Sequence, residues 1–311
     1  MPMPQDFSAP RTRTEKIDHL LHDYVDGVLN RRALVRRLAR LTGGTAAAMA
    51  VLQTEGLAQV AQQNCPAGIK VAEDDKAVQA QDITYPSGSD TIMAHLARPA
   101  GQRGPQPAVL VLSENRGLTD HIRDVTRRMA KNGYVGLGID LLSRQGGTRK
   151  FPDDQAKTQA YAKTVPEERL QDIRSAIEFL QKQSFVQADR IGAVGFCAGG
   201  GNVYASVFQG FPLQAGVAFY GGLPNPVPAA DKIHTPVLGI FSENDRNQAT
   251  RIPELVNSLV TARVTFDIQL YKGTNHGFHN DTSPIYDPVA ACDAWGKTLA
   301  WFNTYLRPAK G

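Results

Sequence analysis

Short apolar runs with the length of β-strands recur along the chain from Asp82 onward. They read "DITY", "TIMAHLA", "PAVLVLS", "YVGLGID", "RIGAVGF", "QAGVAFY", "TPVLGIF" and "VTFDIQLY". Between most of the later runs lie segments with helical spacing of apolar residues, over 120–132, 166–183, 248–262 and 288–305. This alternation predicts an α/β fold, a mostly parallel sheet flanked by helices, with the first two strands forming an antiparallel hairpin at one edge.

The runs "PAVLVL" and "IGAVGF" are apolar throughout and show no alternation. Strands buried on both faces have this composition, so we expect both runs at the centre of the sheet. In parallel sheets, functional groups gather beyond the carboxyl ends of the strands. We therefore expect functional residues to follow the carboxyl ends of the predicted strands.

The first seventy residues have a different character from the rest. Residues 15–29 predict an amphipathic helix, and Arg31 and Arg32 precede an alanine-rich apolar run over 38–52 and then small residues. This order is typical of a twin-arginine export signal, and the run is too short and too weakly apolar to span a bilayer. The alternative is a retained helical hairpin on a cytoplasmic protein. We therefore predict a helical extension over 1–70 and a catalytic domain over 78–308.

Composition narrows the function classes. The chain has 311 residues, of which 42% are hydrophobic, enough to bury a full-sized core. Its net charge of +4 comes with arginines concentrated near the N-terminus, so no basic stripe predicts nucleic-acid binding. The three cysteines are widely and irregularly spaced, which favours neither a zinc site nor a disulfide framework and leaves thiol chemistry or packing.

One cysteine follows a predicted strand within the sequence Gly195-Phe196-Cys197-Ala198-Gly199. This is the G-x-nucleophile-x-G form of a nucleophile elbow, a sharp turn that needs small neighbours where the backbone closes on itself. The residues after it predict a helix, whose amino end would stabilise a thiolate at Cys197 and an oxyanion beside the N–H of Ala198. The alternative is a glycine-rich turn that holds an inert buried cysteine.

An acid and a base follow later strands. Asp245 comes after "TPVLGIF", and His276 lies in the loop "GTNHG" after "VTFDIQLY". The order nucleophile, acid, base is that of the α/β-hydrolases. His276 would then move the proton and Asp245 would hold the imidazole. Glu243 as the acid and His279 as the base are the alternatives.

The loop after "PAVLVLS" reads "ENRGL". In the hydrolase pattern this loop supplies the second oxyanion N–H, here that of Asn115. Glu114 beside it would repel a thiolate yet could accept the thiol proton, and so keep the cysteine unreactive until substrate arrives. The alternative for Glu114 is an ion pair with Arg116 or another arginine.

Over roughly residues 80–307 the chain resembles the dienelactone hydrolase family. The motifs that carry the resemblance are "SENRG", "LLSRQGG", "GFCAGG", "AFYGG", "END" and "NHGF". The resemblance implies an α/β-hydrolase fold. It implies roles for six residues: Cys197 as nucleophile, Asp245 and His276 as its partners, Glu114 as the activator of the thiol, Arg144 as the holder of a substrate carboxylate, and Tyr220 as a substrate-binding residue. Where the family carries a second arginine, this chain has Asn280.

Together these features predict a hydrolase that cleaves a small-molecule carboxylic ester or lactone by a Cys-His-Asp triad and an acyl-enzyme. The chemistry needs no metal and no organic cofactor. The alternative class is a non-catalytic binding or scaffold protein that uses the N-terminal helix as its working surface. A peptidase of the same fold is less favoured, because the chain has no propeller or large lid segment.

Overall fold

The structure is a computed structural model that describes residues 16–17, 20, 31–44, 70–228 and 233–307. It divides into two units, Met1–Pro66 and Ala67–Gly311.

The first unit contains helix α2 (Arg31–Thr42), in which Leu34 and Leu38 are buried. Most of the predicted helix over 15–29, and the apolar run beyond residue 44, lie outside the described residues. Within the described residues of the whole chain, none of the helices combines the length and apolarity needed to cross a membrane.

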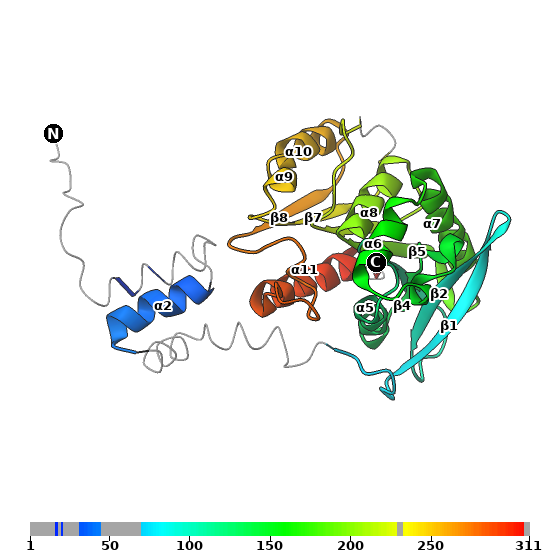
Figure 1. Ribbon diagram of the computed structural model, residues 1–311, viewed down its shortest axis with the longest axis horizontal. Coiled ribbons are helices and arrows are strands. Elements are labelled where there is room, and N and C mark those ends of the chain that lie inside the picture. Colours follow the sequence, from blue (N-terminus) through cyan, green and yellow to red (C-terminus); the bar gives the residue numbers. More distant parts are fainter. Residues whose placement is uncertain (1–15, 18–19, 21–30, 45–69, 229–232, 308–311) are drawn as a thin grey trace. The chain divides into compact units, whose positions relative to one another are not determined.

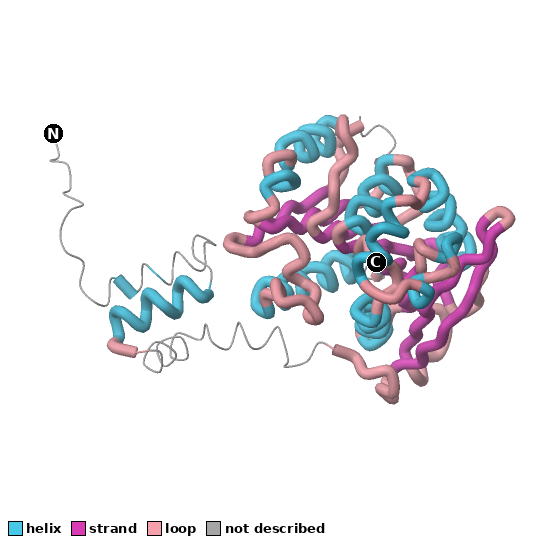
Figure 2. The backbone as a smooth tube through the Cα atoms, in the orientation of Figure 1, coloured by secondary structure: helices cyan, strands magenta, loops and turns pink. Residues whose placement is uncertain are grey.

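An eight-stranded sheet forms the centre of the second unit (Figures 1 and 2). Its strands are β1 (Val78–Ser87), β2 (Asp90–Pro99), β3 (Gln106–Leu112), β4 (Val135–Ile139), β5 (Val186–Phe196), β6 (Ala215–Phe219), β7 (Val237–Ser242) and β8 (Phe266–Tyr271). They lie in the order β1-β2-β4-β3-β5-β6-β7-β8. The pairs β1–β2 and β2–β4 are antiparallel and all other pairs are parallel, which confirms the predicted sheet and its edge hairpin.

Helices cover both faces of the sheet. On one face lie α5 (Asp120–Lys131) and α11 (Pro288–Leu306), and on the other lie α7 (Pro166–Gln181) and α8 (Ala198–Phe208). These agree with the predicted helices to within a few residues. The segment predicted over 248–262 instead forms two helices, α9 (Arg246–Ala249) and α10 (Ile252–Thr261). Pro253 in the first turn of α10 favours a new helix start at this point, because proline lacks the N–H that an interior position needs.

Strand β3 shows how the core divides into two layers. Ala108, Leu110 and Leu112 are fully buried in the layer that contains α7 and α8, whereas Val109 and Val111 are fully buried in the layer that contains α5 and α11. Alternate side chains of a strand point to opposite faces, so an unbroken apolar run fills both layers. The predicted central position of this run is confirmed.

The connection between β4 and α7 was not predicted to be helical. It contains two 3₁₀ turns, η1 (Ser143–Gln145) and η2 (Thr148–Lys150), and the helix α6 (Asp154–Ala162). Only Ala160 and Tyr161 of α6 are buried, so its sequence carries little apolar periodicity. A local signal does exist, because the carboxylate of Asp153 caps the helix by accepting a hydrogen bond of 2.8 Å from Ala156 N–H.

Candidate active site

Cys197 lies at the sharp turn between β5 and α8. Its backbone has φ 55° and ψ −114°, a conformation that residues with a side chain rarely adopt. The turn is held by its neighbours, because Cys197 N–H donates to Phe219 O at 3.0 Å and Gly201 N–H donates to Cys197 O at 3.1 Å. A half-buried, free thiol therefore sits on a strained strand-to-helix turn, the geometry of a nucleophile elbow.

The glycines around Cys197 allow the backbone segments to approach closely. A Cβ on Gly195 would lie 2.2 Å from Gly199 O, and a Cβ on Gly199 would lie 2.2 Å from Leu112 O. Both contacts are with backbone atoms, which cannot rotate away. The predicted need for small residues on either side of the cysteine is confirmed at these two positions.

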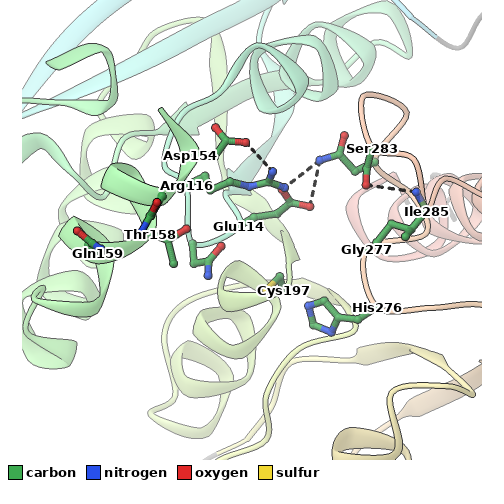
Figure 3. A pocket seen from close by; sticks show the side chains of 13 residues that line it. Glu114, Arg116, Asp154, Thr158, Gln159, Cys197, His276, Gly277, Ser283 and Ile285 are labelled. Atoms are coloured by element: carbon green, nitrogen blue, oxygen red, sulfur yellow. Dashed lines mark hydrogen bonds and ion pairs between the residues drawn. The ribbon is translucent and has the colours of Figure 1, made fainter. Parts of the chain in front are cut away.

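A cavity of about 570 Å³ opens above the elbow (Figure 3). Its walls come from the loop after β3, from α6, from the elbow, and from the loop after β8. The lining residues are Glu114, Asn115, Arg116, Asp154, Gln155, Thr158, Gln159, Cys197, His276, Gly277, Asn280, Ser283 and Ile285.

The structure pairs two of the predicted triad residues directly. Asp245 follows β7, His276 follows β8, and the distance between Asp245 Oδ2 and His276 Nδ1 is 2.5 Å. The ionised carboxylate only accepts, so His276 Nδ1 carries the hydrogen and the other ring nitrogen is left for the pocket. Figure 3 shows the imidazole beside Cys197. Burial alone would lower the pKa of His276, but its interactions with Cys197 and Asp245 raise that pKa to about 9.

The alternative acid and base occupy other roles. The carboxylate of Glu243 accepts a hydrogen bond of 2.8 Å from Gly273 N–H. The ring of His279 is fully buried and lies 5.0 Å from the rings of both Phe196 and Phe219. Burial, together with the nearby His121 and Arg128, lowers its pKa well below the usual value. His279 is therefore a neutral core residue, and His276 is the imidazole on the pocket wall.

Glu114 forms the ion pair that was the alternative expectation for it. Its Oε2 lies 2.5 Å from Arg116, and both carboxylate oxygens accept hydrogen bonds from Asn280 Nδ2, at 3.2 and 3.1 Å. Arg116 also donates to Asp154 at 2.9 Å (Figure 3). A chain of polar contacts thus runs from α6 through the loop after β3 to the loop of His276.

The structure does not bring Arg144 to the pocket. Its guanidinium donates to Asp172 at 3.2 and 2.8 Å and also pairs with Asp90. These contacts tie the turn between β1 and β2 to α7. The guanidinium of Arg144 is therefore paired with two carboxylates of the protein and does not face the cavity.

Two other expected site residues lie beside the pocket. Tyr220 is fully buried, and its ring lies 4.9 Å from the imidazole of His276, so the two rings pack against each other. Ala198 is the first residue of α8 and follows Cys197 directly. Asn115 does line the pocket.

Sequence reasoning missed the contribution of α6 to the pocket. Gln155, Thr158 and Gln159 line the cavity from this helix, and Arg116 was considered only as a partner of Glu114. The spacing of 155, 158 and 159 places them on one helix face, but that pattern becomes informative only once the helix is recognised.

Cys292 corrects the expectation drawn from the cysteine spacing. It lies in α11 and is disulfide-bonded, whereas Cys197 is free. Irregular spacing therefore did not exclude a disulfide, because the pairing of cysteines depends on the fold and not on their separation in sequence.

A sheet in this strand order, with a nucleophile elbow after a central strand and an acid–imidazole pair after later strands, defines an α/β-hydrolase. The model of the dienelactone hydrolase family matches residues 92–306. The chain belongs to the dienelactone hydrolase family.

Relatives and solved structures agree with this assignment. A protein of Methylorubrum extorquens named "Putative carboxymethylenebutenolidase" is 31% identical over 257 residues, covering 79% of this chain and 88% of its own. A Klebsiella pneumoniae structure titled "Putative Dienelactone Hydrolase" is 30% identical with a TM-score of 0.68, covering 74% of this chain and all of its own. The dienelactone hydrolase of Anabaena variabilis, at 19% identity and a TM-score of 0.58, covers 74% of this chain and all of its own and shares the fold.

The close contacts of the elbow predict a specific cost for adding one methyl group. Gly199→Ala should destabilise the protein by about 1–3 kcal/mol, because its Cβ meets the fixed carbonyl of Leu112. Gly296→Ala in α11 is the matched control, since nothing lies within 4 Å of its Cβ, and it should stabilise by up to about 1 kcal/mol. Urea unfolding of both variants measures the difference, and equal stabilities would contradict the close packing.

The raised pKa of His276 predicts a pH-dependent contribution to stability. Its contacts with Cys197 and Asp245 should contribute fully below its unfolded pKa of about 6.5, and the contribution should disappear as the pH rises through about 9. The stability of wild type minus that of His276→Asn should therefore be larger near about pH 6 than near about pH 10. Urea unfolding at several pH values tests this, and a pH-independent difference would refute it.

Proposed function

We propose that this dienelactone hydrolase-like hydrolase, which acts on esters or lactones, cleaves its substrate by a Cys-His-Asp triad through an acyl-enzyme. One observation carries the proposal: the free thiol of Cys197, on its elbow, lines the same pocket as the imidazole of the His276–Asp245 pair.

In the first half-reaction, the thiolate of Cys197 forms a bond to the carbonyl carbon while the C=O π bond breaks. The resulting oxyanion accepts hydrogen bonds from the N–H groups of Ala198 and Asn115. The tetrahedral intermediate then expels the alkoxide, which takes its proton from the His276 imidazolium. A pKa near 9 supports this role, since it keeps the imidazole protonated at neutral pH.

In the second half-reaction, the now neutral His276 takes a proton from water as the oxygen attacks the thioester carbonyl. Collapse of the new tetrahedral intermediate breaks the carbon–sulfur bond and releases the acid. This step restores the thiolate and the imidazolium. Asp245 accepts a hydrogen bond from His276 Nδ1–H throughout the reaction. This contact fixes which ring nitrogen exchanges protons with the substrate.

The Glu114–Arg116–Asn280 contacts support a resting state in which Glu114 is held by partners other than the thiol. Activation of Cys197 by Glu114 would require that carboxylate to leave Arg116. With His276 raised to a pKa of about 9 by Cys197 and Asp245, the imidazole is the acceptor of the thiol proton in our proposal.

The proposal predicts the effect of removing the sulfur. Cys197→Ala should abolish hydrolysis of p-nitrophenyl acetate, a loss of at least about 10³-fold, because no acyl-enzyme can form. Circular dichroism and the melting temperature should show an intact fold. Cys292→Ala is the control that removes a disulfide-bonded cysteine, and it should keep turnover in molecules that remain folded. Undiminished turnover by Cys197→Ala would end the proposal.

The pocket also suggests which arginine meets a substrate carboxylate. Arg116 lines the cavity, and one of its partners, Asp154, has a side chain that is 58% exposed. An ion pair that open to water is weak, so a substrate carboxylate could replace Asp154 on the guanidinium. Arg144, held by Asp90 and by the buried Asp172, is not among the residues that line the cavity.

This assignment predicts different effects for the two arginines. Arg116→Gln should lower kcat/KM for a carboxylate-bearing ester by about 10-fold or more relative to a matched neutral ester, because a charge-assisted hydrogen bond is lost. Arg144→Gln should leave that ratio unchanged and lower the melting temperature instead, because Asp172 loses its cation. Lys157→Gln, which removes a cation beside Asp154 outside the pocket lining, is the control. If kcat/KM for the carboxylate-bearing ester, relative to that for the neutral ester, falls only in Arg144→Gln, the assignment is reversed.

A further inference from the structure

We propose that Asp281 is a positioning residue for the reaction: its buried contacts with His121 and Arg128 hold the loop of His276 against α5. The inference rests on the proposed function, since it assigns a role in presenting His276 to Cys197. Asp281 touches neither the pocket nor the thiol and therefore acts through the loop that it anchors.

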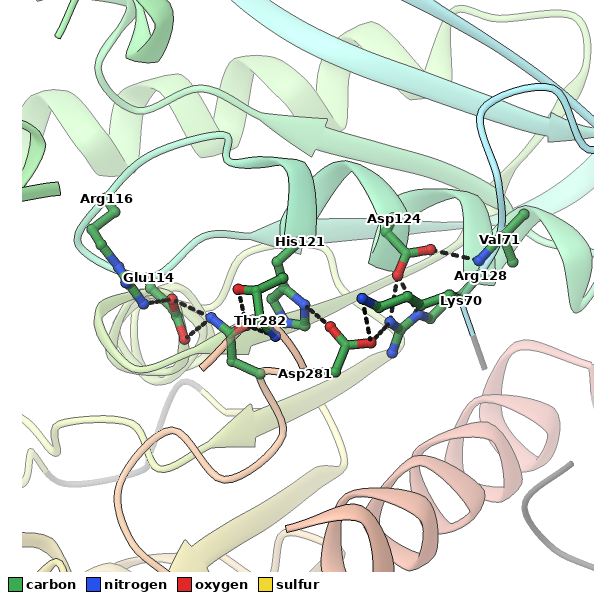
Figure 4. A network of polar contacts seen from close by, with 10 residues as sticks. Lys70, Val71, Glu114, Arg116, His121, Asp124, Arg128, Asp281 and Thr282 are labelled. Carbon is green, nitrogen blue, oxygen red and sulfur yellow. Dashed lines mark hydrogen bonds and ion pairs between the residues drawn. The ribbon is translucent and has the colours of Figure 1, made fainter. Parts of the chain in front are cut away.

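The contacts of Asp281 are buried and directional (Figure 4). Its side chain is 7% exposed, and its two oxygens meet His121 Nδ1 at 3.1 Å and Arg128 Nη2 at 2.8 Å. Lys70 lies 3.8 Å away but is largely exposed and adds little. Burial would raise the pKa of Asp281, but hydrogen bonds from His121 and the charge of Arg128 lower it far below its usual value. The carboxylate is therefore ionised and holds both partners.

Arg128 makes this contact rigid from the other side. Its side chain is 1% exposed, and it also pairs with Asp124 one helical turn earlier in α5. Asp124 in turn accepts a hydrogen bond of 2.7 Å from Val71 N–H. Asp281 thus binds a guanidinium that cannot shift without breaking a second buried ion pair.

The loop that Asp281 anchors carries two groups of the site. His276 lies five residues before Asp281, and the side chain of the adjacent residue, Asn280, donates to Glu114 in the loop after β3. The Asp281 contacts thus fix one end of the segment that contains His276, and they fix the neighbour of the residue that contacts Glu114.

His121 extends the same anchor toward the nucleophile. Its ring lies 6.1 Å from the ring of Phe196, the residue directly before Cys197, and 5.9 Å from that of His279. The ring of His279 stacks 5.0 Å from Phe196 as well. The end of β5 and the histidine loop therefore pack on one shared set of rings, so a shift of the loop would change its distance from the elbow.

Displacing a catalytic group by about 1 Å can cost about 100-fold in rate. Asp281→Asn should lower kcat for p-nitrophenyl acetate by about 10-fold or more and change KM by less than about twofold, because none of the residues that line the cavity is replaced. It should also slow the alkylation of Cys197 by iodoacetamide at neutral pH and shift the pH profile of that alkylation toward the profile of His276→Asn. Alkylation reports on the thiol and imidazole without any ester substrate.

Two variants of His121 separate positioning from folding. His121→Phe removes the hydrogen bond to Asp281 and should reproduce the effects of Asp281→Asn, whereas His121→Asn places an amide nitrogen near the Nδ1 position and should restore kcat to within about threefold of wild type. Asp75→Asn is the matched control, because it breaks a different ion pair to α5, with Lys131 at 2.7 Å, and does not touch the loop. It should leave kcat and the alkylation profile unchanged.

A lower melting temperature in Asp281→Asn and His121→Phe with an unchanged kcat and alkylation profile would overturn the proposal and leave the cluster a purely structural one. If Asp281→Asn does not fold, comparing kcat and the alkylation profile of His121→Phe with those of His121→Asn tests the proposal instead. Failure of the triad itself is distinguishable, because Cys197→Ala would then retain turnover whatever the Asp281 variants do.

Discussion

The close approach of backbone segments around the elbow is the constraint on which the rest of the site depends. The first turn of α8 lies so near the end of β3 that only hydrogen fits at Gly199, and a Cβ on Gly200 would lie 2.7 Å from the carbonyl of Phe219 at the end of β6. Cys197 is therefore fixed to three neighbouring strands at once. A side chain mounted this way has little freedom, so the other groups of the pocket must be brought to it.

The other groups of the pocket lie on longer loops. Ionic contacts fix the positions of these loops, whereas close backbone packing fixes the position of Cys197. Asp245 orients His276, while the polar chain through Asn280, Glu114 and Arg116 links the loop of His276 to the loop after β3. Buried and half-buried ion pairs of this kind contribute little net stability but specify geometry, because a misplaced partner leaves a desolvated charge unpaired. The site thus combines a rigidly mounted cysteine with loops held in place by ionic contacts.

The sequence predicts the sheet, the elbow and the acid–imidazole pairing because each depends on local patterns: apolar runs, glycine spacing and position after a strand. It does not predict the surroundings of Arg144. That guanidinium is claimed by Asp90 and Asp172, residues 54 and 28 positions away, and nothing in "SRQ" reveals which carboxylates the fold will bring near. Helix α6 was not predicted for another reason. A polar helix beside a pocket has too few buried residues for its apolar positions to recur at helical spacing. The disulfide of Cys292 was likewise set by the tertiary fold.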